Sequence, residues 1–307
     1  MGAQSSLGAI LTLQFTIFAL ILVGFWVRRK GMVGPEGQKN LTDLVVNVIL
    51  PCNILSAFQN GADRERIAAY LSILLTALAI QVVSRLYGMW VFRRAPEGQK
   101  ACLHYATICP NSGFIGNPVA EGMYGAEGLA LASVYLIPLR IVMWSAGISM
   151  FTGEHDRKAV LRRVATHPCI LACVAGIILM LTGFRLPEAV FGPVSALGKC
   201  NTAASMLVIG MILARIDFRR FLDRSVLVYC LHRLVILPAL FYALFRFLPL
   251  DPLVFKISVL LTAMPAGATT SILAEKYGRD SEYATKLVIV STLLSIPSIF
   301  LWSLLLA

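Results

Sequence analysis

The stretch Pro110-Asn111-Ser112-Gly113-Phe114-Ile115-Gly116-Asn117-Pro118 decides the fold, because it interrupts an apolar run that begins at Ala101. Proline lacks a backbone donor and glycine favours non-helical conformations, so a regular α-helix cannot continue through this stretch. An apolar half-helix of about ten residues reaches about 15 Å, half the hydrocarbon thickness of a bilayer. If the chain spans a membrane, the break lies near the midplane.

The composition indicates a membrane protein. Of the 307 residues, 58% are hydrophobic and 14% are charged, whereas a soluble globular domain carries about 25% charged residues. The excess apolar surface must therefore face lipid, which excludes a cytosolic enzyme, a secreted disulfide scaffold and a disordered adaptor. The net charge of +11 comes from short basic clusters between apolar runs, whereas nucleic acid requires a continuous basic stripe. We expect an all-α polytopic membrane protein that binds no nucleic acid.

Ten apolar stretches of about 20 residues, the length that crosses a bilayer, follow one another along the chain. They are residues 7–27, 41–59, 68–92, 101–121, 128–152, 168–184, 192–214, 225–247, 253–274 and 284–306. Lys and Arg gather in the loops after the odd-numbered spans, and such loops face the cytoplasm. The sequence predicts a multi-pass protein of the cell (inner or plasma) membrane with both termini outside.

The predicted spans divide into two halves of five, 1–152 and 168–307, joined by a cytoplasmic linker at 153–167. Because five is odd, the halves must run through the membrane in opposite directions. Landmarks recur in corresponding spans: Arg85-Leu86 with Arg233-Leu234, Pro110 with Pro265, and Pro138 with Pro297. This pattern favours two inverted repeats, an architecture of secondary transporters.

The second half contains a matching break, Pro265-Ala266-Gly267-Ala268-Thr269-Thr270. Helices that start at the two breaks would point free N–H groups and positive dipole ends at the membrane centre, which suits a carboxylate. The alternative is a pair of packing kinks, since Gly and Pro are common in membrane helices. The predicted crossover residues are Pro110, Pro118, Pro265 and Gly267, and the predicted substrate-binding residues are Asn111, Ser112, Gly113, Gly116, Asn117, Thr269 and Thr270.

Basic side chains inside the spans extend the predicted substrate site. Arg140 is the deepest charge, and it either pairs with a substrate carboxylate or binds carbonyls freed by Pro138. Lys199 lies near the outer surface, where snorkelling is the alternative, but Asn201 gives its helix a polar face. We expect Arg140, Lys199 and Asn201 to contact the substrate.

Acidic side chains are nearly absent from the spans, where Asp43 and Glu121 are the exceptions. A broken-helix cation antiporter needs carboxylates at the midplane, so the sequence favours an anion. Asp43 and Glu121 are the candidate coupling residues of the alternative, a sodium- or proton-coupled carrier. Arg85 and Arg233 are expected to hold loops or helix ends.

The remaining candidate residues point to structural roles. His104 and His232 are isolated, so hydrogen bonding is favoured over a proton relay, and neither has the partners that an enzyme site needs. The seven cysteines lie in apolar segments and are interpreted as small buried hydrophobes. Pro51, with Asn47 and Asn53, marks a second surface that either lines the cavity or is a plain kink. We expect no metal, no cofactor and no enzymatic activity.

Three stretches resemble the auxin efflux carrier family, which includes bacterial organic-acid carriers and the plant PIN-formed proteins. They are Leu41-Thr42-Asp43-Leu44 through Leu50-Pro51-Cys52-Asn53-Ile54-Leu55; Asn111 to Pro118 with Tyr124-Gly125-Ala126-Glu127-Gly128-Leu129; and Met264-Pro265-Ala266 with Leu273-Ala274-Glu275-Lys276-Tyr277-Gly278 and Ser291-Thr292-Leu293-Leu294-Ser295. With the ten-span layout, the resemblance covers essentially the whole chain. The long loop between spans five and six of PIN-type members is missing, so the chain is similar to small bacterial-type members.

The resemblance implies a fold like that of bile-acid symporters and sodium/proton antiporters. In that fold a panel domain of spans 1, 2, 6 and 7 faces a core domain of spans 3–5 and 8–10, and broken spans 4 and 9 cross at the two prolines. Substrate binds beside the crossing, so Asn111 is the first residue carried over. The implied function is secondary transport of a small organic anion, auxin-like or a mono- or dicarboxylate such as malate or malonate, by an elevator-like motion. The expected partners are this anion and the lipid bilayer, with a homodimer left open.

Overall fold

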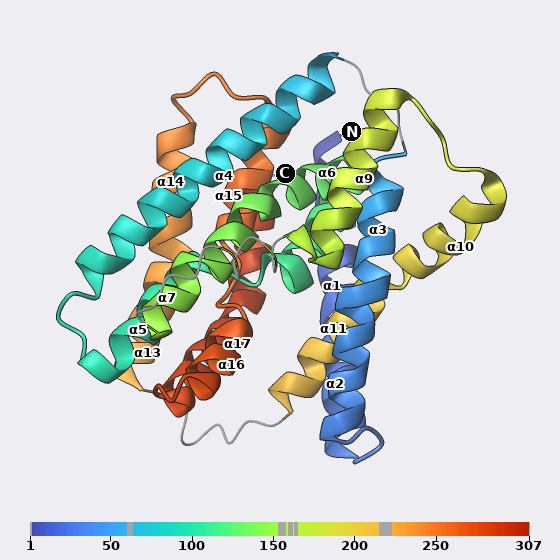
Figure 1. Ribbon diagram of the computed structural model, residues 1–307. Coiled ribbons are helices and arrows are strands. Elements are labelled where there is room, and N and C mark those ends of the chain that lie inside the picture. Colours follow the sequence, from blue (N-terminus) through green and yellow to red (C-terminus); the bar gives the residue numbers. More distant parts are fainter. Residues whose placement is uncertain are drawn as a thin grey trace.

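The computed structural model describes residues 2–59, 64–152, 165–214 and 223–306, with Lys158 and Arg162. In this part of the chain the structure is helical, apart from one isolated pairing of two extended segments (Figure 1). The predicted all-helical class is confirmed. Most of the predicted linker at 153–167 lies outside the described residues.

Helices lie on all ten of the predicted apolar stretches; the label η marks π-helical turns. The first half contains α1 (Gly2–Arg29), α2 (Pro35–Leu44), η1 (Val45–Ile49), α3 (Leu50–Ala57), α4 (Arg64–Val91), α5 (Glu97–Ile108), η2 (Ser112–Gly116), α6 (Asn117–Trp144) and α7 (Ala146–Thr152). The second half contains α9 (Pro168–Thr182), α10 (Glu188–Lys199), α11 (Asn201–Leu213), α13 (Arg224–Leu231), η3 (His232–Ile236), α14 (Leu237–Phe245), α15 (Pro252–Thr262), α16 (Thr269–Lys276) and α17 (Ser281–Leu305). Gly125, at φ 65°, breaks α6 internally, so its first two turns form a separate short segment.

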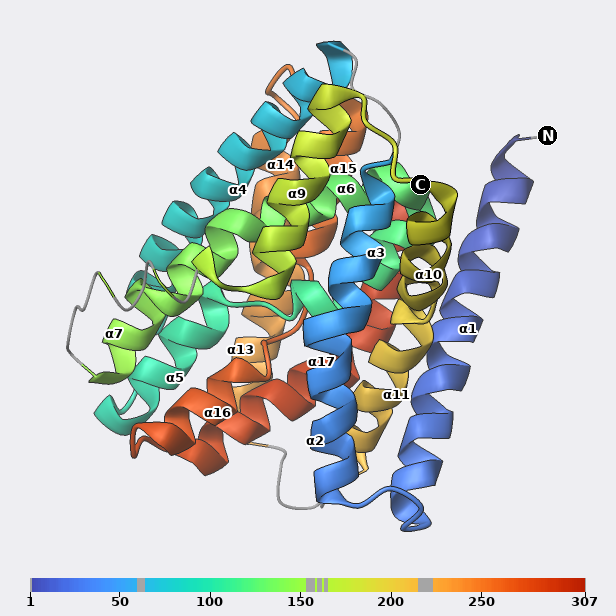
Figure 2. The same ribbon diagram turned by 45° about the vertical axis from the view of Figure 1, so that its right-hand side comes forward.

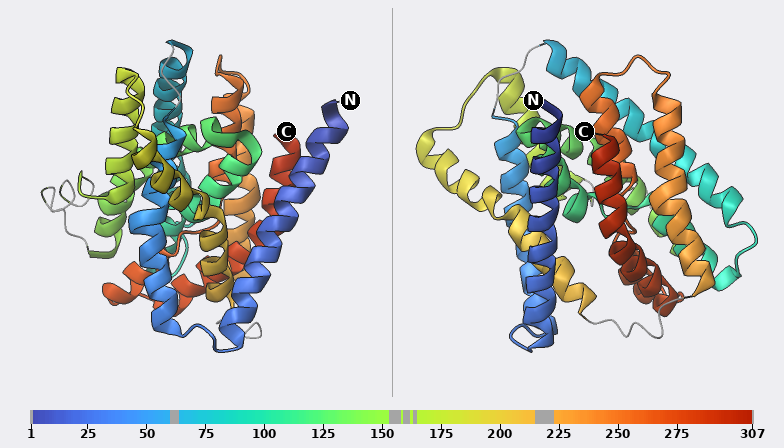
Figure 3. Two further views of the ribbon diagram at one scale, coloured as in Figure 1. Left: turned by 90° about the vertical axis from the view of Figure 1, so that its right-hand side faces the viewer. Right: turned by 180° about the vertical axis from the view of Figure 1, so that it is seen from behind.

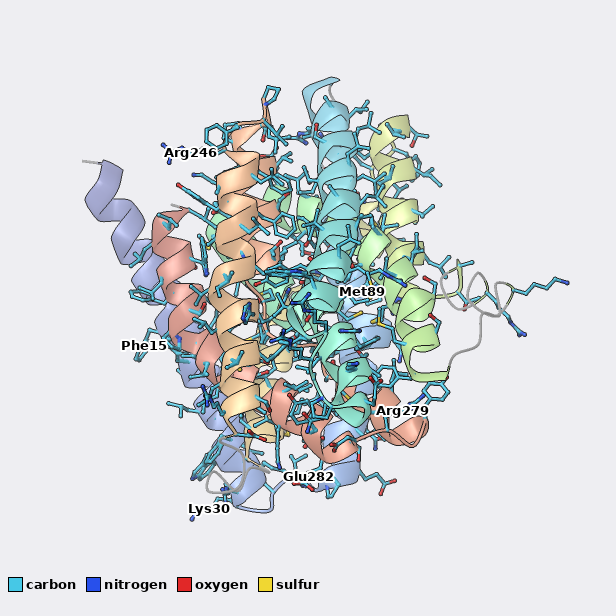
Figure 4. All side chains as sticks on the ribbon, turned by 90° about the vertical axis from the view of Figure 1, so that its left-hand side faces the viewer. Phe15, Lys30, Met89, Arg246, Arg279 and Glu282 are labelled. Atoms are coloured by element: carbon cyan, nitrogen blue, oxygen red, sulfur yellow. The ribbon has the colours of Figure 1, made fainter. Side chains whose placement is uncertain are left out.

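Six continuous helical stretches in the described chain are long and apolar enough to cross a membrane. They are Pro35–Ala57, Arg66–Val91, Ser112–Met143, Glu188–Leu213, Arg224–Phe245 and Ser281–Leu305, and the shorter α9 and α15 are also apolar. In Figure 4, Lys30 and Glu282 lie toward one end of the molecule and Arg246 toward the other, with Phe15 and Met89 between them. Charged ends around an apolar belt are what a polytopic membrane protein requires.

Each π-helical turn ends two residues before a proline; the prolines are Pro51, Pro118 and Pro238. Proline has no N–H and its ring displaces the carbonyl four residues earlier, and the wider π turn accommodates that displacement. The carbonyl freed by Pro238 belongs to Leu234, and it accepts hydrogen bonds from Ser298 Oγ at 3.1 Å and Trp302 Nε1 at 2.9 Å. The freed backbone group is therefore satisfied inside the protein, as lipid demands.

Helix α1 packs against α11 through direct backbone contact at two glycines, and Figure 2 shows α1 at the edge of the molecule. A Cβ at Gly210 would lie 2.0 Å from the carbonyl oxygen of Ile21, and one at Gly24 would lie 2.2 Å from that of Leu207. Neither position can hold a side chain without separating the helices. Small residues at helix crossings are the usual means of close packing in membranes.

The helices pack in two groups. In the first, α1 and α2 contact α11, while α3 contacts α9 and α10; in the second, α4 contacts α5 and α6, α14 contacts α15, and α17 contacts α13 and α16. The two groups meet where α3 and η2 approach α6 and α11, and where α1 approaches α17. The start of α1 and the end of α17 lie toward the same side of the molecule (Figure 3).

Candidate functional site

The two predicted helix breaks meet each other. Helix α5 ends at Ile108 and α15 at Thr262, and the chain after each is non-helical. The backbone N–H of Asn111 donates to the carbonyl of Pro265 at 2.7 Å, and the N–H of Gly267 donates to that of Cys109 at 2.9 Å. We call this contact, residues 109–111 with 263–268, the crossing. The predicted breaks at Pro110 and Pro265 are therefore present, and Pro110 pairs antiparallel with Ala266.

Two glycines allow the crossing to be this close. A Cβ at Gly267 would lie 2.8 Å from the carbonyl oxygen of Cys109, and one at Gly116 would lie 2.6 Å from Leu261 Cδ2. Both distances are shorter than side-chain atoms tolerate. A side chain at position 267 would therefore collide with backbone at the crossing, whereas at position 116 the end of the Leu261 side chain would have to move.

Several hydroxyl groups at the crossing are used to hold backbone and side chains together. Ser112 Oγ donates to the carbonyl of Leu261 at 3.1 Å, and Ser291 Oγ accepts from the N–H of Ala266 at 3.1 Å. Thr269 Oγ1 accepts a hydrogen bond from the Tyr105 hydroxyl at 3.0 Å. In this structure Ser112 and Thr269 therefore have structural partners.

Three polar side chains of the predicted site are buried without such partners. In the described chain no hydrogen-bond partner is present for Arg140 Nη1, for either side-chain atom of Asn117, or for Thr270 Oγ1. Asn117 begins α6 directly after the η2 turn, and Thr270 lies in the first turn of α16. Buried polar groups are nearly always paired in proteins, so each of these is a position where a ligand atom would be stabilising.

Arg140 lies beside the start of η2. A Cβ placed on Gly113 would be 3.8 Å from Arg140 Nη2, and the arginine side chain is only 7% exposed. Arg140 Nη1 has no hydrogen-bond partner among the described residues, and both roles of Arg140, pairing with a substrate carboxylate and binding carbonyls freed by Pro138, stay predictions. The first N–H groups of η2 have no acceptor within the helix, so a guanidinium and free amides come together here.

His167, which precedes α9, lies close to Arg140 and was not singled out by its sequence. Its Nδ1 accepts from the N–H of Cys169 at 3.2 Å. Burial, and after it the charge of Arg140, lowers the pKa of His167 to about 4. The imidazole is therefore neutral at physiological pH. A lone histidine before an apolar helix carries no sequence signal that would reveal this neighbour.

A chain of polar side chains links α3, α6 and α11. Asn53 Nδ2 donates to Glu121 Oε1 at 3.0 Å, Asn201 Nδ2 donates to Asn53 Oδ1 at 3.1 Å, and Ser205 Oγ donates to Asn201 Oδ1 at 3.3 Å. Asn53, Asn201 and Ser205 are buried. Sequence analysis placed Asn53, Glu121 and Asn201 in different roles, because nothing local indicates that they meet.

Other predicted residues lie away from the crossing. The side chains of Asp43 on α2 and Lys199 at the end of α10 are exposed. His232 is hydrogen-bonded to the Tyr87 hydroxyl, which fits the expected structural role. Within the described residues no group of His, Cys, Asp and Glu is arranged to hold a metal ion. A separate cavity of about 480 Å³ lies between α13 and α17 and is lined almost wholly by apolar side chains. Its lining contains no charged side chain that would bind a carboxylate.

Apolar spanning helices that are interrupted where two buried, polar breaks meet define a polytopic membrane transporter. The family model described as "Membrane transport protein" matches residues 9–303. The chain belongs to this membrane transport protein family, in agreement with the resemblance to auxin efflux carriers. It is a transporter and not an enzyme.

Full-length relatives give the same class. The chain is 29% identical over 300 residues to an "Uncharacterized transporter" of Methanothermobacter thermautotrophicus, covering 94% of this chain and 95% of the relative. It is 22% identical to the "Uncharacterized transporter YfdV" of Escherichia coli K12, covering 93% and 94%. It is also 22% identical to a "Putative malonate transporter" of Rhizobium meliloti, covering 94% and 92%.

Proposed function

We propose that the protein is a secondary transporter of a small organic anion, in the class of mono- and dicarboxylates such as malonate or malate or of auxin-like acids. The observation that carries this proposal is the buried side chain of Arg140, whose Nη1 has no hydrogen-bond partner among the described residues, beside the free amides at the start of η2. Both groups attract a carboxylate. The chain has no acidic residue between Glu97 and Glu121 or between Asp251 and Glu275, so neither break carries a carboxylate of its own. The name of the Rhizobium meliloti relative supports the same substrate class.

The proposed site combines the crossing with the side chains around it. Asn111, Ser112, Gly113, Gly116 and Asn117 would contribute from the first break and Thr269 and Thr270 from the second, with Arg140 and Asn201 facing them. Ser112 and Thr269 would have to exchange their present partners for the substrate. Lys199 stays a prediction, and its exposed side chain suits attraction of anions more than their binding.

We further propose that the chain is built from ten spans in two inverted five-span repeats, with both termini outside. The group of α1–α3 and α9–α11 would form the panel, and the group of α4–α7 and α13–α17 the core. The core would carry the crossing and its substrate across the membrane by sliding against the panel. The separate packing of the two groups supports this division.

The proposal is tested with purified protein by thermal shift and by uptake into proteoliposomes. Malonate, malate, acetate and indole-3-acetate are offered to the wild type, to Asn111→Ala and to Arg140→Met. We expect at least one acid to raise the melting temperature of the wild type and to be transported. Loss of one charge-assisted pair costs about 1.5–3 kcal/mol, so Arg140→Met should weaken binding roughly tenfold or more.

Matched controls separate binding from general damage. Asn47→Ala removes an exposed asparagine that bonds within its own helix, and Arg85→Met removes an exposed arginine; both should bind like the wild type. A wild type that neither binds nor moves any of these acids would refute the proposed function.

The second candidate function is a sodium- or proton-coupled carrier of the same fold. The contact between Glu121 and Asn53 favours it, because it places a carboxylate between panel and core. Asp43 is exposed on α2 and is the weaker candidate. Transport by Glu121→Gln and Asp43→Asn under imposed sodium and pH gradients tests this alternative, which fails if both variants and the wild type ignore the gradients.

A further inference from the structure

We infer that the guanidinium of Arg233 is a permanent positive charge at the crossing. It caps the two interrupted helices and takes the place of a bound inorganic cation there. The inference rests on the proposed transport function and goes beyond it, since it assigns a positioning residue and excludes a sodium requirement at this site. It starts from two hydrogen bonds that join one side chain to both breaks.

At the crossing, the direction of the two helices brings partial negative charges close together. Helices α5 and α15 both arrive there with their C-terminal ends, so two negative dipole ends face the same region. The last carbonyls of a helix have no intrahelical donor. Within a membrane such carbonyls must be satisfied by protein groups or by a bound ion.

Arg233 supplies the missing positive charge to both helix ends. Its Nε donates to the carbonyl of Met264 at 2.9 Å, and its Nη1 donates to the carbonyl of Thr107 at 3.1 Å. Thr107 is in the last turn of α5, and Met264 lies two residues beyond α15. The side chain is 2% exposed, so lipid and water do not weaken these bonds.

No carboxylate neutralises this arginine. The segment from Arg224 to Phe245 contains no Asp or Glu, and no salt bridge to Arg233 is present among the described residues. The titratable groups that interact with it are those of Tyr229, Tyr135 and Cys109, which are ordinarily uncharged at neutral pH. The hydroxyl of Tyr229 also donates to the carbonyl of Ala106, at 2.9 Å, and so adds a neutral donor to the end of α5.

A permanent guanidinium at this position leaves no role for sodium at the same carbonyls. The oxygens that would coordinate the ion already accept from Arg233, and an added cation would be repelled by its charge. The positive ends of η2 and α16 then remain uncompensated until an anion arrives. Arg233 therefore positions the half-helices and biases the crossing toward anions.

Arg85 gives the matched comparison. It precedes a leucine in the third span of the first half as Arg233 does in the second half, yet its side chain is exposed. The arginine itself is therefore not the decisive feature; its burial against two helix ends is. Arg85→Met is the control for every Arg233 variant.

The first experiment needs no substrate. The melting temperature of the purified wild type is measured in sodium chloride, lithium chloride and choline chloride at equal ionic strength. We expect the three values to agree within about 1 °C, because a cation that binds the native state would raise the melting temperature with its concentration. Specific stabilisation by sodium or lithium would overturn the inference and leave the anion-transport proposal standing.

The second experiment uses uptake of whichever acid the wild type transports. We expect the wild-type initial rate to be equal in sodium and choline, Arg233→Met to lose about tenfold or more of it, and Arg233→Lys to recover part of it. Full activity of Arg233→Met would overturn the inference. If Arg233→Met does not fold, Arg233→Lys decides: it should keep its rate independent of sodium, and a sodium requirement in that variant or in the wild type would overturn the inference. Failure of every acid to be transported would count against the proposed function, while the melting experiment still tests Arg233.

Discussion

Asn53 on α3 donates its side-chain amide to the carboxylate of Glu121 on α6, at 3.0 Å to Oε1 and 3.3 Å to Oε2. This pair joins the two groups of helices where α3 approaches α6. Asn201 on α11 donates a hydrogen bond to Oδ1 of the same Asn53 side chain. This second bond fixes the orientation of the Asn53 amide. A motion of one group against the other must break the contact.

We expect Asn53→Leu to lower thermal stability in detergent. It removes the donor to Glu121 and leaves a carboxylate and the Asn201 amide without a partner, which costs about 1–3 kcal/mol. Differential scanning fluorimetry measures the effect. Asn47→Leu is the control, because that asparagine is exposed and bonds within its own helix; an equal drop in both variants would contradict the expected role of Asn53.

Replacement of Gly210 by valine should separate α1 from α11. The new side chain would occupy space where Ile21 carbonyl oxygen lies 2.0 Å from the Cβ position, and overpacking of this kind costs about 1–3 kcal/mol or more. The measurement is the yield of monodisperse protein and its melting temperature. Gly192→Val places the same side chain where nothing lies within 4 Å, and its behaviour should match the wild type far more closely.

Trp302→Phe should destabilise the protein by about 1 kcal/mol. The indole N–H donates to the Leu234 carbonyl that Pro238 leaves free, and phenylalanine keeps an aromatic ring, although a smaller one, while removing the donor. Trp90→Phe is the matched control, since Trp90 is 68% exposed and faces outward. If the two variants melt at the same temperature, the indole bond contributes nothing measurable.

Acid should weaken the fold through His167. Its pKa is about 4 in the native protein against 6.5 for an ordinary histidine, so between these values the unfolded chain binds more protons than the folded one. Stability from this group is complete above pH 6.5 and is lost as the pH falls toward 4. Melting temperatures of the wild type and His167→Gln, measured from pH 7 to pH 4, should lie close together at high pH and separate as the pH falls, with the wild type becoming the less stable, because glutamine can still accept from Cys169 but cannot be protonated. A constant difference across the range would exclude His167 as the origin.

Sequence patterns predicted the helices and their breaks because both depend on local chemistry. Proline and glycine at 110–118 and 265–267 prevent a regular helix wherever they occur, and apolar runs of sufficient length form helices in lipid. The meeting of Arg233 with Thr107 and Met264 could not be predicted in the same way. Those contacts join residues 126 and 31 positions apart, and only the packed fold brings them together.

Individual site residues show the same difference between what local sequence predicts and what depends on packing. The sequence left Arg140 with two roles, and only the packed fold places it beside Gly113 with an Nη1 that has no partner among the described residues. Asn53, Glu121 and Asn201 were each noted, but their common chain depends on how α3, α6 and α11 pack. The π-helical turns before Pro51, Pro118 and Pro238 were not predicted, since the sequence marks a kink but not its geometry.

A charge that is covalently fixed has a bioenergetic consequence. Because the arginine at the crossing never leaves with the substrate, every turnover under our proposal would carry the anion's charge uncompensated, and current would flow. A voltage of 100 mV is worth about 2.3 kcal/mol for each elementary charge moved. In a cell whose interior is negative, that voltage drives anions outward, so a carrier that moves the anion without a coupled cation would favour efflux.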